Sequence, residues 1–189
     1  MIDKNRVYWF PMRVTYGRHL KVKEYLDSEQ IENFLPMTTR TVKTNGRIRH
    51  KRVPAINNLI FVRHTMAKLT DLKQQSAVAA PLRYMTRRTL AAGDAPAEII
   101  TVPDSQMENF IKVASGPENE ITYLTGKELA GKANGRVTIT SGPFAGVHGT
   151  IKRIHGNRRV VVELENLGGA CINFVPKACM AMEEQPTAL

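Results

Sequence analysis

The second half of the chain consists of short β-rich runs separated by glycine-containing turns, and this pattern constrains the fold more than any other feature. The turns are Ser141-Gly142-Pro143, Gly156-Asn157 and Gly168-Gly169. They separate four runs, which are Val137 to Thr140, Val147 to Ile154, Arg159 to Leu164 and Ala170 to Val175. Short strands at this spacing are typical of a small all-β barrel of about 50 residues. We therefore expect a barrel over residues 134–182 and a flexible tail over 183–189.

The first part of the chain alternates between strand and helix patterns. Strands are predicted over residues 7–14, 31–35, 56–63 and 82–86, and helices over 18–29, 66–75 and from Asp104 to Ala114. Leu20, Tyr25 and Leu26 are expected to form the core stripe of the first helix. Pro11 indicates a sheet edge or a bulge, because proline cannot donate to a ladder.

These patterns predict an α+β protein of two domains. Residues 1–115 would form an α/β sandwich with a mainly antiparallel four-stranded sheet and about three helices. Residues 116–133 contain several glycines and prolines without clear periodicity, so we expect a linker there, followed by the SH3-like barrel.

Positive charge is concentrated in the first third of the chain. The whole sequence carries 27 Lys and Arg against 17 Asp and Glu, a net charge of +10. Residues 1–66 have a net charge of +8, residues 67–130 of −1 and residues 131–189 of +3. A charge of this size indicates a polyanionic partner, which could be DNA, RNA or an acidic protein face.

Part of this charge lies on a predicted β-hairpin. Asn45-Gly46 separates two short alternating runs, which is a strong signal for a two-residue hairpin turn. The segment from 40 to 52 contains no acidic residue, and its cations are Arg40, Lys43, Arg47, Arg49, Lys51 and Arg52. Such a run can be a solvated face, but six cations without a counter-charge on one hairpin favour contact with nucleic acid.

The sequence offers little support for catalysis, cofactor binding or a membrane span. The five histidines have no carboxylate or cysteine at a recognised spacing, and no nucleophile or P-loop motif is present. Cys171 and Cys179 are too few for a disulfide scaffold and lack the pattern of a metal site. No apolar run reaches the ~18 residues of a membrane span. We expect a cytoplasmic protein that is not an enzyme and needs no cofactor or metal.

Residues 135–151, GRVTITSGPFAGVHGTI, closely resemble the KOW motif, with a strand, a tight Gly-Pro-Phe turn and a glycine-containing second strand. The N-terminal part resembles NusG-type transcription elongation factors. That resemblance rests on Trp9-Phe10, Arg13-Val14 and Tyr16-Gly17-Arg18, and on the order of elements over roughly residues 6–180. The long basic insertion and short linker are similar to specialised relatives, such as the UpxY-type antiterminators of capsule operons.

The resemblance implies binding to the clamp helices of RNA polymerase through an apolar depression on the third strand. The residues it implicates are Arg13, Ile56, Leu59, Phe61 and Phe110. The family pattern Pro-x-Phe-Pro-Gly-Tyr-(Val/Leu)-Phe-Val reads PAINNLIFV here over residues 54–62, so two aromatic positions are aliphatic. Binding would keep the clamp closed and suppress pausing or termination, in the manner of an antitermination factor.

Further partners follow from the charge and from the resemblance. Tyr16, Arg18 and Lys21 lie where the first strand meets its helix, where they can contact non-template DNA or simply form a solvated helix end. The hairpin would add contacts to DNA or nascent RNA through Lys43, Arg47, Arg49, Lys51 and Arg52. Phe144 and Ile154 are candidate contacts of the barrel with a ribosomal protein or a termination factor. We expect a monomer, and the alternative function is that of a KOW-type ribosomal or structural RNA-binding protein.

Overall fold

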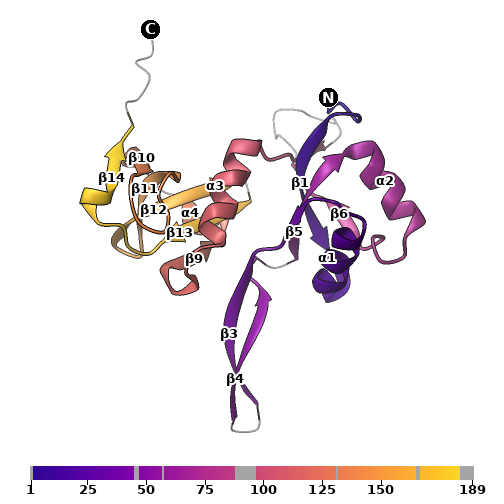
Figure 1. Ribbon diagram of the computed structural model, residues 1–189, viewed down its shortest axis with the longest axis horizontal. Coiled ribbons are helices and arrows are strands. Elements are labelled where there is room, and N and C mark those ends of the chain that lie inside the picture. Colours follow the sequence, from indigo (N-terminus) through magenta and orange to yellow (C-terminus); the bar gives the residue numbers. More distant parts are fainter. Residues whose placement is uncertain are drawn as a thin grey trace. The chain divides into compact units, whose positions relative to one another are not determined.

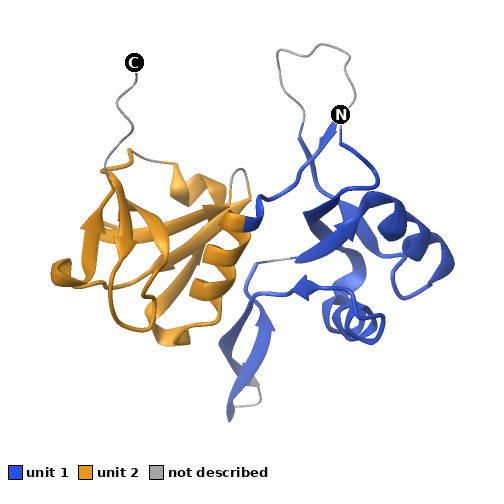
Figure 2. Cartoon of the chain, turned by 45° about the horizontal axis from the view of Figure 1, so that its top comes forward, with its two compact units in different colours: residues 1–104 blue, residues 105–189 orange. Residues whose placement is uncertain are grey.

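The computed structural model describes residues 2–44, 47–56, 58–87, 97–130, 132–164 and 167–183. The chain divides into two compact units, residues 1–104 and residues 105–189, which are coloured separately in Figure 2. Each unit contains its own sheet and its own buried side chains. This agrees with the predicted α+β class, an α/β unit followed by an all-β sheet.

The first unit is built on a four-stranded antiparallel sheet with the strand order β2-β5-β1-β6 (Figure 1). Its elements are β1 (Val7–Val14), the 3-10 turn η1 (Thr15–Gly17), α1 (His19–Ser28), β2 (Asn33–Phe34), β3 (Met37–Thr44), β4 (Arg47–Pro54), β5 (Leu59–Thr65), α2 (Met66–Gln75), β6 (Leu82–Tyr84), β7 (Thr86–Arg87) and β8 (Glu98–Ile99). Strands β7 and β8 form a separate two-stranded pair.

One face of this sheet forms the core of the first unit. Phe10, Met12 and Val14 of β1 alternate toward it, together with Ile60 and Val62 of β5. Helices α1 and α2 cover this face with the apolar side chains Val22, Leu26, Leu69 and Leu72. The core therefore forms where every second side chain of the strands packs against the apolar stripe of each helix.

Helix α2 spans the predicted residues, and Thr65 caps its start. The side-chain oxygen of Thr65 accepts a hydrogen bond from the backbone N–H of Lys68 at 3.3 Å, as an N-cap threonine does. The prediction for Leu20 of α1 is wrong, because this side chain is 51% exposed. The buried residues of α1 are His19, Val22 and Leu26, a stripe at helical spacing that leaves Leu20 outside it.

The expectation that Pro11 marks an edge or a bulge is also wrong. Strand β1 is internal, between β5 and β6, and Pro11 pairs with Phe61 of β5 in regular register. The carbonyl of Pro11 accepts from the N–H of Met85, one residue past the end of β6. The backbone nitrogen of Pro11 points to the same side as its carbonyl, toward the position just past the end of β6. Because β6 has no residue at that position, the lack of an N–H on Pro11 costs no hydrogen bond of the ladder.

Strands β3 and β4 form the predicted hairpin, which extends away from the sheet of the first unit (Figure 1). The register runs from Met37 opposite Pro54 to Thr44 opposite Arg47. The turn predicted at Asn45-Gly46 falls on the two residues between Thr44 and Arg47. These two residues lie outside the described part of the chain.

The second unit contains a six-stranded antiparallel sheet with the order β14-β10-β11-β12-β13-β9. Its elements are α3 (Asp104–Ala114, whose first residue belongs to unit 1), η3 (Glu118–Glu120), β9 (Ile121–Leu124), α4 (Gly126–Leu129), β10 (Arg136–Ile139), β11 (His148–Ile154), β12 (Asn157–Leu164), β13 (Gly168–Ile172), η4 (Lys177–Cys179) and β14 (Met180–Met182). The turn between β10 and β11 contains Gly142 at φ +87° and Gly146 at φ +80°. This backbone region favours glycine.

The division of the chain differs from the predicted domain limits at 115 and 134. The boundary lies between Asp104 and Ser105, so most of α3 belongs to the second unit. Residues 116–133, expected to be a linker, contain η3, β9 and α4, and β9 pairs with β13. Most of the expected tail, residues 184–189, lies outside the described residues.

Local interactions explain why the segment predicted as a linker is ordered. The backbone N–H and the hydroxyl of Thr125 both donate to the Glu128 carboxylate, at 2.8 Å and 2.7 Å. These bonds fix the start of α4. Leu124 and Leu129 belong to a core cluster with Ile154, Val161 and Cys171. The apolar residues of this segment therefore complete the core of the second unit.

Candidate functional site

The second face of the first unit's sheet brings together three of the predicted polymerase-binding residues. Arg13 of β1 lies opposite Leu59 of β5, and Pro11 lies opposite Phe61. These side chains lie on the opposite face of the sheet from the core residues of β1 and β5. Arg13 is exposed, whereas Leu59 and Phe61 have exposed fractions of 3% and 0%. Of these three residues, only Arg13 offers its side chain to solvent.

The other two predicted polymerase-binding residues lie elsewhere. Ile56 is half-buried in the turn that precedes β5, where its carbonyl accepts from the N–H of Leu59 at 3.4 Å. Phe110 lies on α3 in the second unit and is fully buried. It packs edge-on against the ring of Tyr123, with 6.4 Å between the ring centroids, an arrangement that aromatic pairs prefer. The predicted set is therefore divided between the two units.

The junction of β1 and α1 exposes an aromatic ring beside cations. Tyr16 adopts φ +61°, and its side chain is 86% exposed. Such a backbone conformation is rare outside glycine. The guanidinium carbon of Arg18 lies 6.0 Å from the centroid of the Tyr16 ring, and Lys21 is exposed on the first turn of α1. An open ring next to positive charge can stack on a base while the cations meet phosphates.

The register of the hairpin distributes its cations unequally between its two faces. Directly opposed residues share a face and successive residues alternate. Arg40 with Lys51 and Val42 with Arg49 therefore lie on one face, which Arg47 joins two residues before Arg49. We call this the arginine-rich face, with the cations Arg40, Arg47, Arg49 and Lys51. The opposite face carries Lys43, Arg52 and His50.

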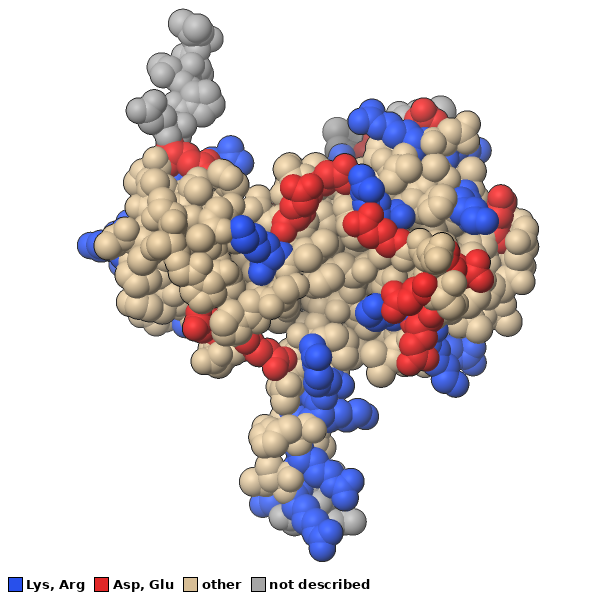
Figure 3. Space-filling view, viewed as in Figure 1, with Lys and Arg blue, Asp and Glu red and all other residues tan. Residues whose placement is uncertain are grey.

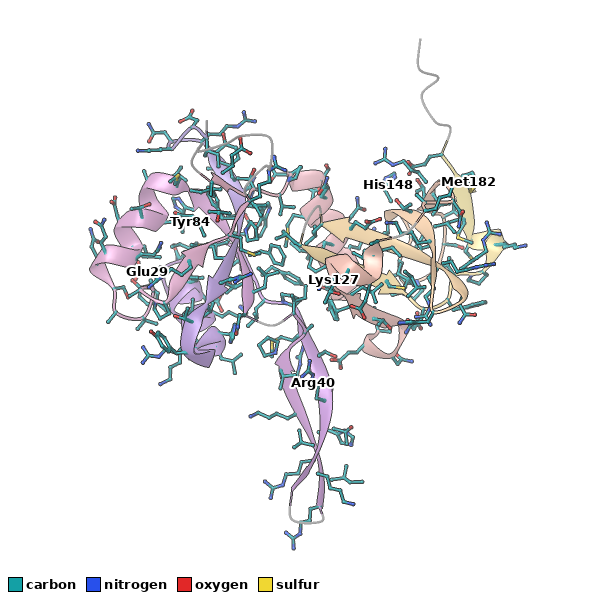
Figure 4. The ribbon with its side chains drawn as sticks, turned by 180° about the vertical axis from the view of Figure 1, so that it is seen from behind. Glu29, Arg40, Tyr84, Lys127, His148 and Met182 are labelled. Atoms are coloured by element: carbon teal, nitrogen blue, oxygen red, sulfur yellow. The ribbon has the colours of Figure 1, made fainter. Side chains whose placement is uncertain are left out.

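The hairpin presents these cations without compensating acids. Residues 37–54 contain no Asp or Glu, and every described side chain from Arg40 to Arg52 is exposed. Lys and Arg atoms cover much of the hairpin in Figure 3, and Figure 4 labels Arg40 on β3. By contrast, Arg63 on β5 is held between Asp104 and Glu32, at 3.2 Å from each, and hydrogen bonding to Asp104 raises the pKa of its guanidinium.

Phe144 and Ile154, the candidate partner contacts on the barrel, are both buried. The Phe144 ring fills the space beside Gly116, where an added Cβ would clash with its Cε1 atom. Ile154 belongs to the core cluster that contains Cys171, and burial raises the pKa of that thiol. Cys171 is thus a small core residue of the second unit.

Sequence reasoning did not identify the exposed apolar side chains of the second unit. Phe174 is 76% exposed and Met182 is 61% exposed. The sequence assigned Phe174 to the last barrel strand, whereas β13 ends at Ile172. The predicted run already stopped before Pro176, so no local signal marks the earlier end of the strand at Ile172.

The described residues contain no group of three or more His, Cys, Asp or Glu side chains that could hold a metal ion. They also contain no helix that is long and apolar enough to cross a bilayer. What they do provide is a basic hairpin and an exposed aromatic–cation cluster, together with the exposed Arg13 on β1. These are features of a protein that binds macromolecules.

The fold and these surfaces define the class of the protein. It is a two-unit binding protein with an α/β sheet unit and a small all-β unit, and its charge suits nucleic acid. The family described as "NusG: Transcription termination factor nusG" matches residues 7–111, more than half of the chain. The chain therefore belongs to the NusG family, a family of non-enzymatic transcription factors.

Other comparisons add little detail. A solved structure described as "Domain interaction in Thermotoga maritima NusG" is 15% identical, with a TM-score of 0.45, and the match covers 96% of this chain and 100% of that chain. No curated protein matched the chain. Family membership rests on the match over residues 7–111.

Proposed function

We propose that this protein is a transcription antitermination factor that binds elongating RNA polymerase and acts at particular operons. The observation that carries the proposal is that the segment matched by the NusG family contains a basic, acid-free hairpin beside the sheet that carries Arg13, Leu59 and Phe61. The exposed Arg13 and the half-buried Ile56 would contact the clamp helices of the polymerase, and the buried Leu59 and Phe61 would support that surface from below. The hairpin would hold the nearby nucleic acid.

The proposed mechanism is a shift in the population of clamp conformations. A factor that binds only the closed clamp stabilises that state by its own binding free energy. Less time in the open state means less pausing and less termination. This mechanism needs no catalysis, so we infer that the protein acts by binding alone. We also infer that it is a cytoplasmic, monomeric factor.

Two kinds of nucleic-acid contact would support this role. Tyr16, Arg18 and Lys21 combine an exposed ring with cations, which suits a single strand with unstacked bases, such as non-template DNA. The hairpin offers charge without an aromatic ring, which suits phosphate contacts to DNA or nascent RNA. The hairpin residues in question are Lys43, Arg47, Arg49, Lys51 and Arg52. The barrel would recruit a second partner, a ribosomal protein or a termination factor, at raised effective concentration.

Polymerase binding by the full chain tests the proposal. Leu59→Asp and Phe61→Asp would place a charge at a buried position and disturb the fold, so their effect on binding alone is ambiguous. Arg13→Glu and Ile56→Asp change an exposed and a half-buried residue of the same region. We expect the pair to weaken polymerase binding about tenfold or more, as interface anchors do.

The matched control is Lys68→Glu, a charge reversal at an exposed position of α2 on the other side of the sheet. It should leave binding at the wild-type level. The proposal fails if the wild-type chain does not bind polymerase, or if the Arg13→Glu, Ile56→Asp variant melts normally and still binds as wild type does.

A basic hollow on the barrel favours the second candidate function, structural RNA binding. It has a volume of about 650 Å³, and its lining includes the cations Lys132, Lys152, Arg153 and Arg158 with one acid, Glu128. Lys152 is already held by the Leu129 carbonyl and the Glu163 carboxylate, at 2.8 Å and 2.9 Å. If this function is the main one, Lys132→Glu with Arg153→Glu will abolish RNA binding by the full chain while hairpin variants retain it.

A further inference from the structure

An open apolar groove crosses the surface of the second unit, on residues that the function proposed above does not use. Its volume is about 640 Å³. It is lined from β11 and β12, from the segment that follows β13, and from β14. The lining residues are Ile151, Arg158, Arg159, Val160, Phe174, Val175, Pro176, Lys177, Met180 and Met182.

The groove has a buried floor and exposed apolar walls. Ile151 and Val160 are register partners on β11 and β12, and both are buried. Phe174 and Met182 stand open to water at 76% and 61% exposure, and Figure 4 labels Met182 on β14. Covering such surface is favourable by about 25 cal/mol for each Å² of apolar area removed from water. Methionine side chains also adapt their shape to an incoming ligand.

The rim of the groove is positive. Arg158, Arg159 and Lys177 line it, and no carboxylate is among its described lining residues. Arg159 donates from Nη1 to the Asn173 side-chain oxygen at 2.7 Å, and its buried Nε has no hydrogen-bond partner among the described residues. The groove therefore combines an apolar floor with donors that suit carboxylates.

One border of the groove is the edge of a sheet. Met180 and Met182 belong to β14, the outermost strand in the order β14-β10-β11-β12-β13-β9, and among the described strands β14 pairs only with β10. An edge strand can accept a further strand from a partner through its backbone groups, with side-chain pockets providing specificity.

We propose that this groove is where the barrel binds its second partner, and that the occupant is an extended protein segment in which apolar side chains alternate with Asp or Glu. The inference rests on the proposed function in that it gives the barrel's partner a place and a chemistry. The occupant's apolar side chains would lie on Ile151, Val160 and Met182, and its carboxylates would meet the cationic rim. It would lie alongside β14 as an additional strand.

A single-stranded nucleic acid fits the groove less well than such a segment. Binding of single strands relies on aromatic side chains on which successive bases stack. The groove has one aromatic residue, Phe174, among six aliphatic, proline or methionine residues. An aliphatic floor suits apolar side chains better than the polar edges of bases.

The test uses the full chain with isotope-labelled methionine methyl groups, eight in all, as NMR reporters. The first probe is a synthetic peptide in which leucine alternates with glutamate. The second has lysine in place of glutamate, and the third is a single-stranded oligothymidylate. We expect the first probe to shift the Met180 and Met182 signals selectively and the other two to leave them in place. The affinity should fall with added salt because the rim is charged.

Matched variants then separate the apolar contribution from the charged one. Phe174→Ser should lower the affinity for the leucine–glutamate peptide about tenfold. Arg158→Glu with Lys177→Glu should lower it by a similar factor. Lys127→Glu reverses an exposed cation of α4 outside the groove and should have no effect. The melting curve of each variant is measured first. Because Phe174 is exposed, we expect Phe174→Ser to melt as the wild type does.

Three results would overturn the inference: no shift at Met180 and Met182, equal binding of the lysine peptide, or tighter binding of the oligothymidylate at the same signals. Polymerase binding by Phe174→Ser is measured in parallel and should equal that of the wild type. If the wild-type chain fails to bind polymerase while the peptide still occupies the groove, the antitermination proposal fails. The inference that the groove binds an acidic, apolar segment then stands by itself.

Discussion

At the scale of single residues, exposure decides which candidate contacts can be tested directly. Arg13 and Tyr16 reach solvent, so their replacement changes a surface. Phe61 and Phe144 are enclosed, and truncating a buried phenylalanine destabilises a protein by about 3–5 kcal/mol. A loss of binding in such variants would report unfolding as readily as a lost contact.

His19 gives the first unit a predicted dependence on pH. Its side chain is buried at the start of α1, and its Nε2 has no hydrogen-bond partner among the described residues. Burial lowers the pKa of His19 below 6.5, although a hydrogen bond to the Gly17 backbone partly opposes this. The folded unit therefore takes up this proton less readily than the unfolded chain, in which the histidine titrates near pH 6.5. Stability should be complete above that pH and should decrease as the pH falls through it toward the lowered pKa.

Urea unfolding monitored by the fluorescence of Trp9, the only tryptophan, measures this effect. The wild-type midpoint should be lower at about pH 5 than at about pH 7.5, and His19→Leu should reduce the difference. Burial also lowers the pKa of His64, so His64→Gln serves as the comparison and should leave the His19 contribution in place. A wild-type midpoint that stays constant across this range would contradict the prediction.

At the scale of elements, the hairpin yields a prediction about salt. Neutralising Arg47, Arg49 and Lys51 to glutamine removes three cations from the arginine-rich face without touching a buried residue. Each lost phosphate contact lowers the magnitude of the slope of log affinity against log salt by roughly 0.7–0.9. The slope of the triple variant should therefore be smaller in magnitude by about 2–3. Filter binding of a DNA duplex and of an RNA over a range of salt concentrations provides the slopes.

The opposite face of the hairpin provides the control for that measurement. Lys43→Gln with Arg52→Gln removes two cations from the same two strands. A smaller change in slope per cation in this variant would assign the contact to the arginine-rich face. Equal changes per cation would indicate a response to net charge alone, and unchanged slopes in both variants would mean that the hairpin is only solvated.

The elements differ in how well the sequence predicted them, for physical reasons. Helix α2 and the hairpin carry local signals, the cap-type residue Thr65 and the Asn-Gly pair, so the limits of α2 and the position of the hairpin were predicted. The outer ends of β3 and β4, at Met37 and Pro54, lie beyond the predicted runs. Strand β9 has only the four residues ITYL, which favour a strand, but its partner β13 lies far along the chain, so the local pattern alone did not reveal it. Without β9, residues 116–133 have the composition of a linker.

The candidate sites follow the same rule. The charge of the hairpin could be predicted because its cations are neighbours in the sequence. The groove could not, because Ile151, Phe174 and Met182 come from separate segments and meet only in the folded unit. The burial of Leu59 and Phe61 also depends on tertiary packing and is absent from the strand pattern itself.

At the scale of the whole molecule, the distribution of charge matches the proposed division of labour. The excess of +8 lies in residues 1–66, which include the hairpin, and the second unit has the groove with its small cationic rim. One unit would thus bind the transcription complex, while the other would recruit a partner whose affinity depends on both apolar contact and charge.

Because each unit has its own core, we expect substitutions in one core to leave the other unit folded. Leu69→Ala opens a cavity in the core of the first unit and Val161→Ala in that of the second. Each should destabilise its own unit, by about 2–5 kcal/mol for the leucine and somewhat less for the valine. The fluorescence of Trp9 reports the first unit, whereas far-ultraviolet circular dichroism reports both. Leu69→Ala should therefore lower the urea midpoint seen by fluorescence, and Val161→Ala should lower part of the dichroism transition without moving the fluorescence midpoint. If both variants shift both signals equally, the chain unfolds as one cooperative body, and the two units are not independent in stability.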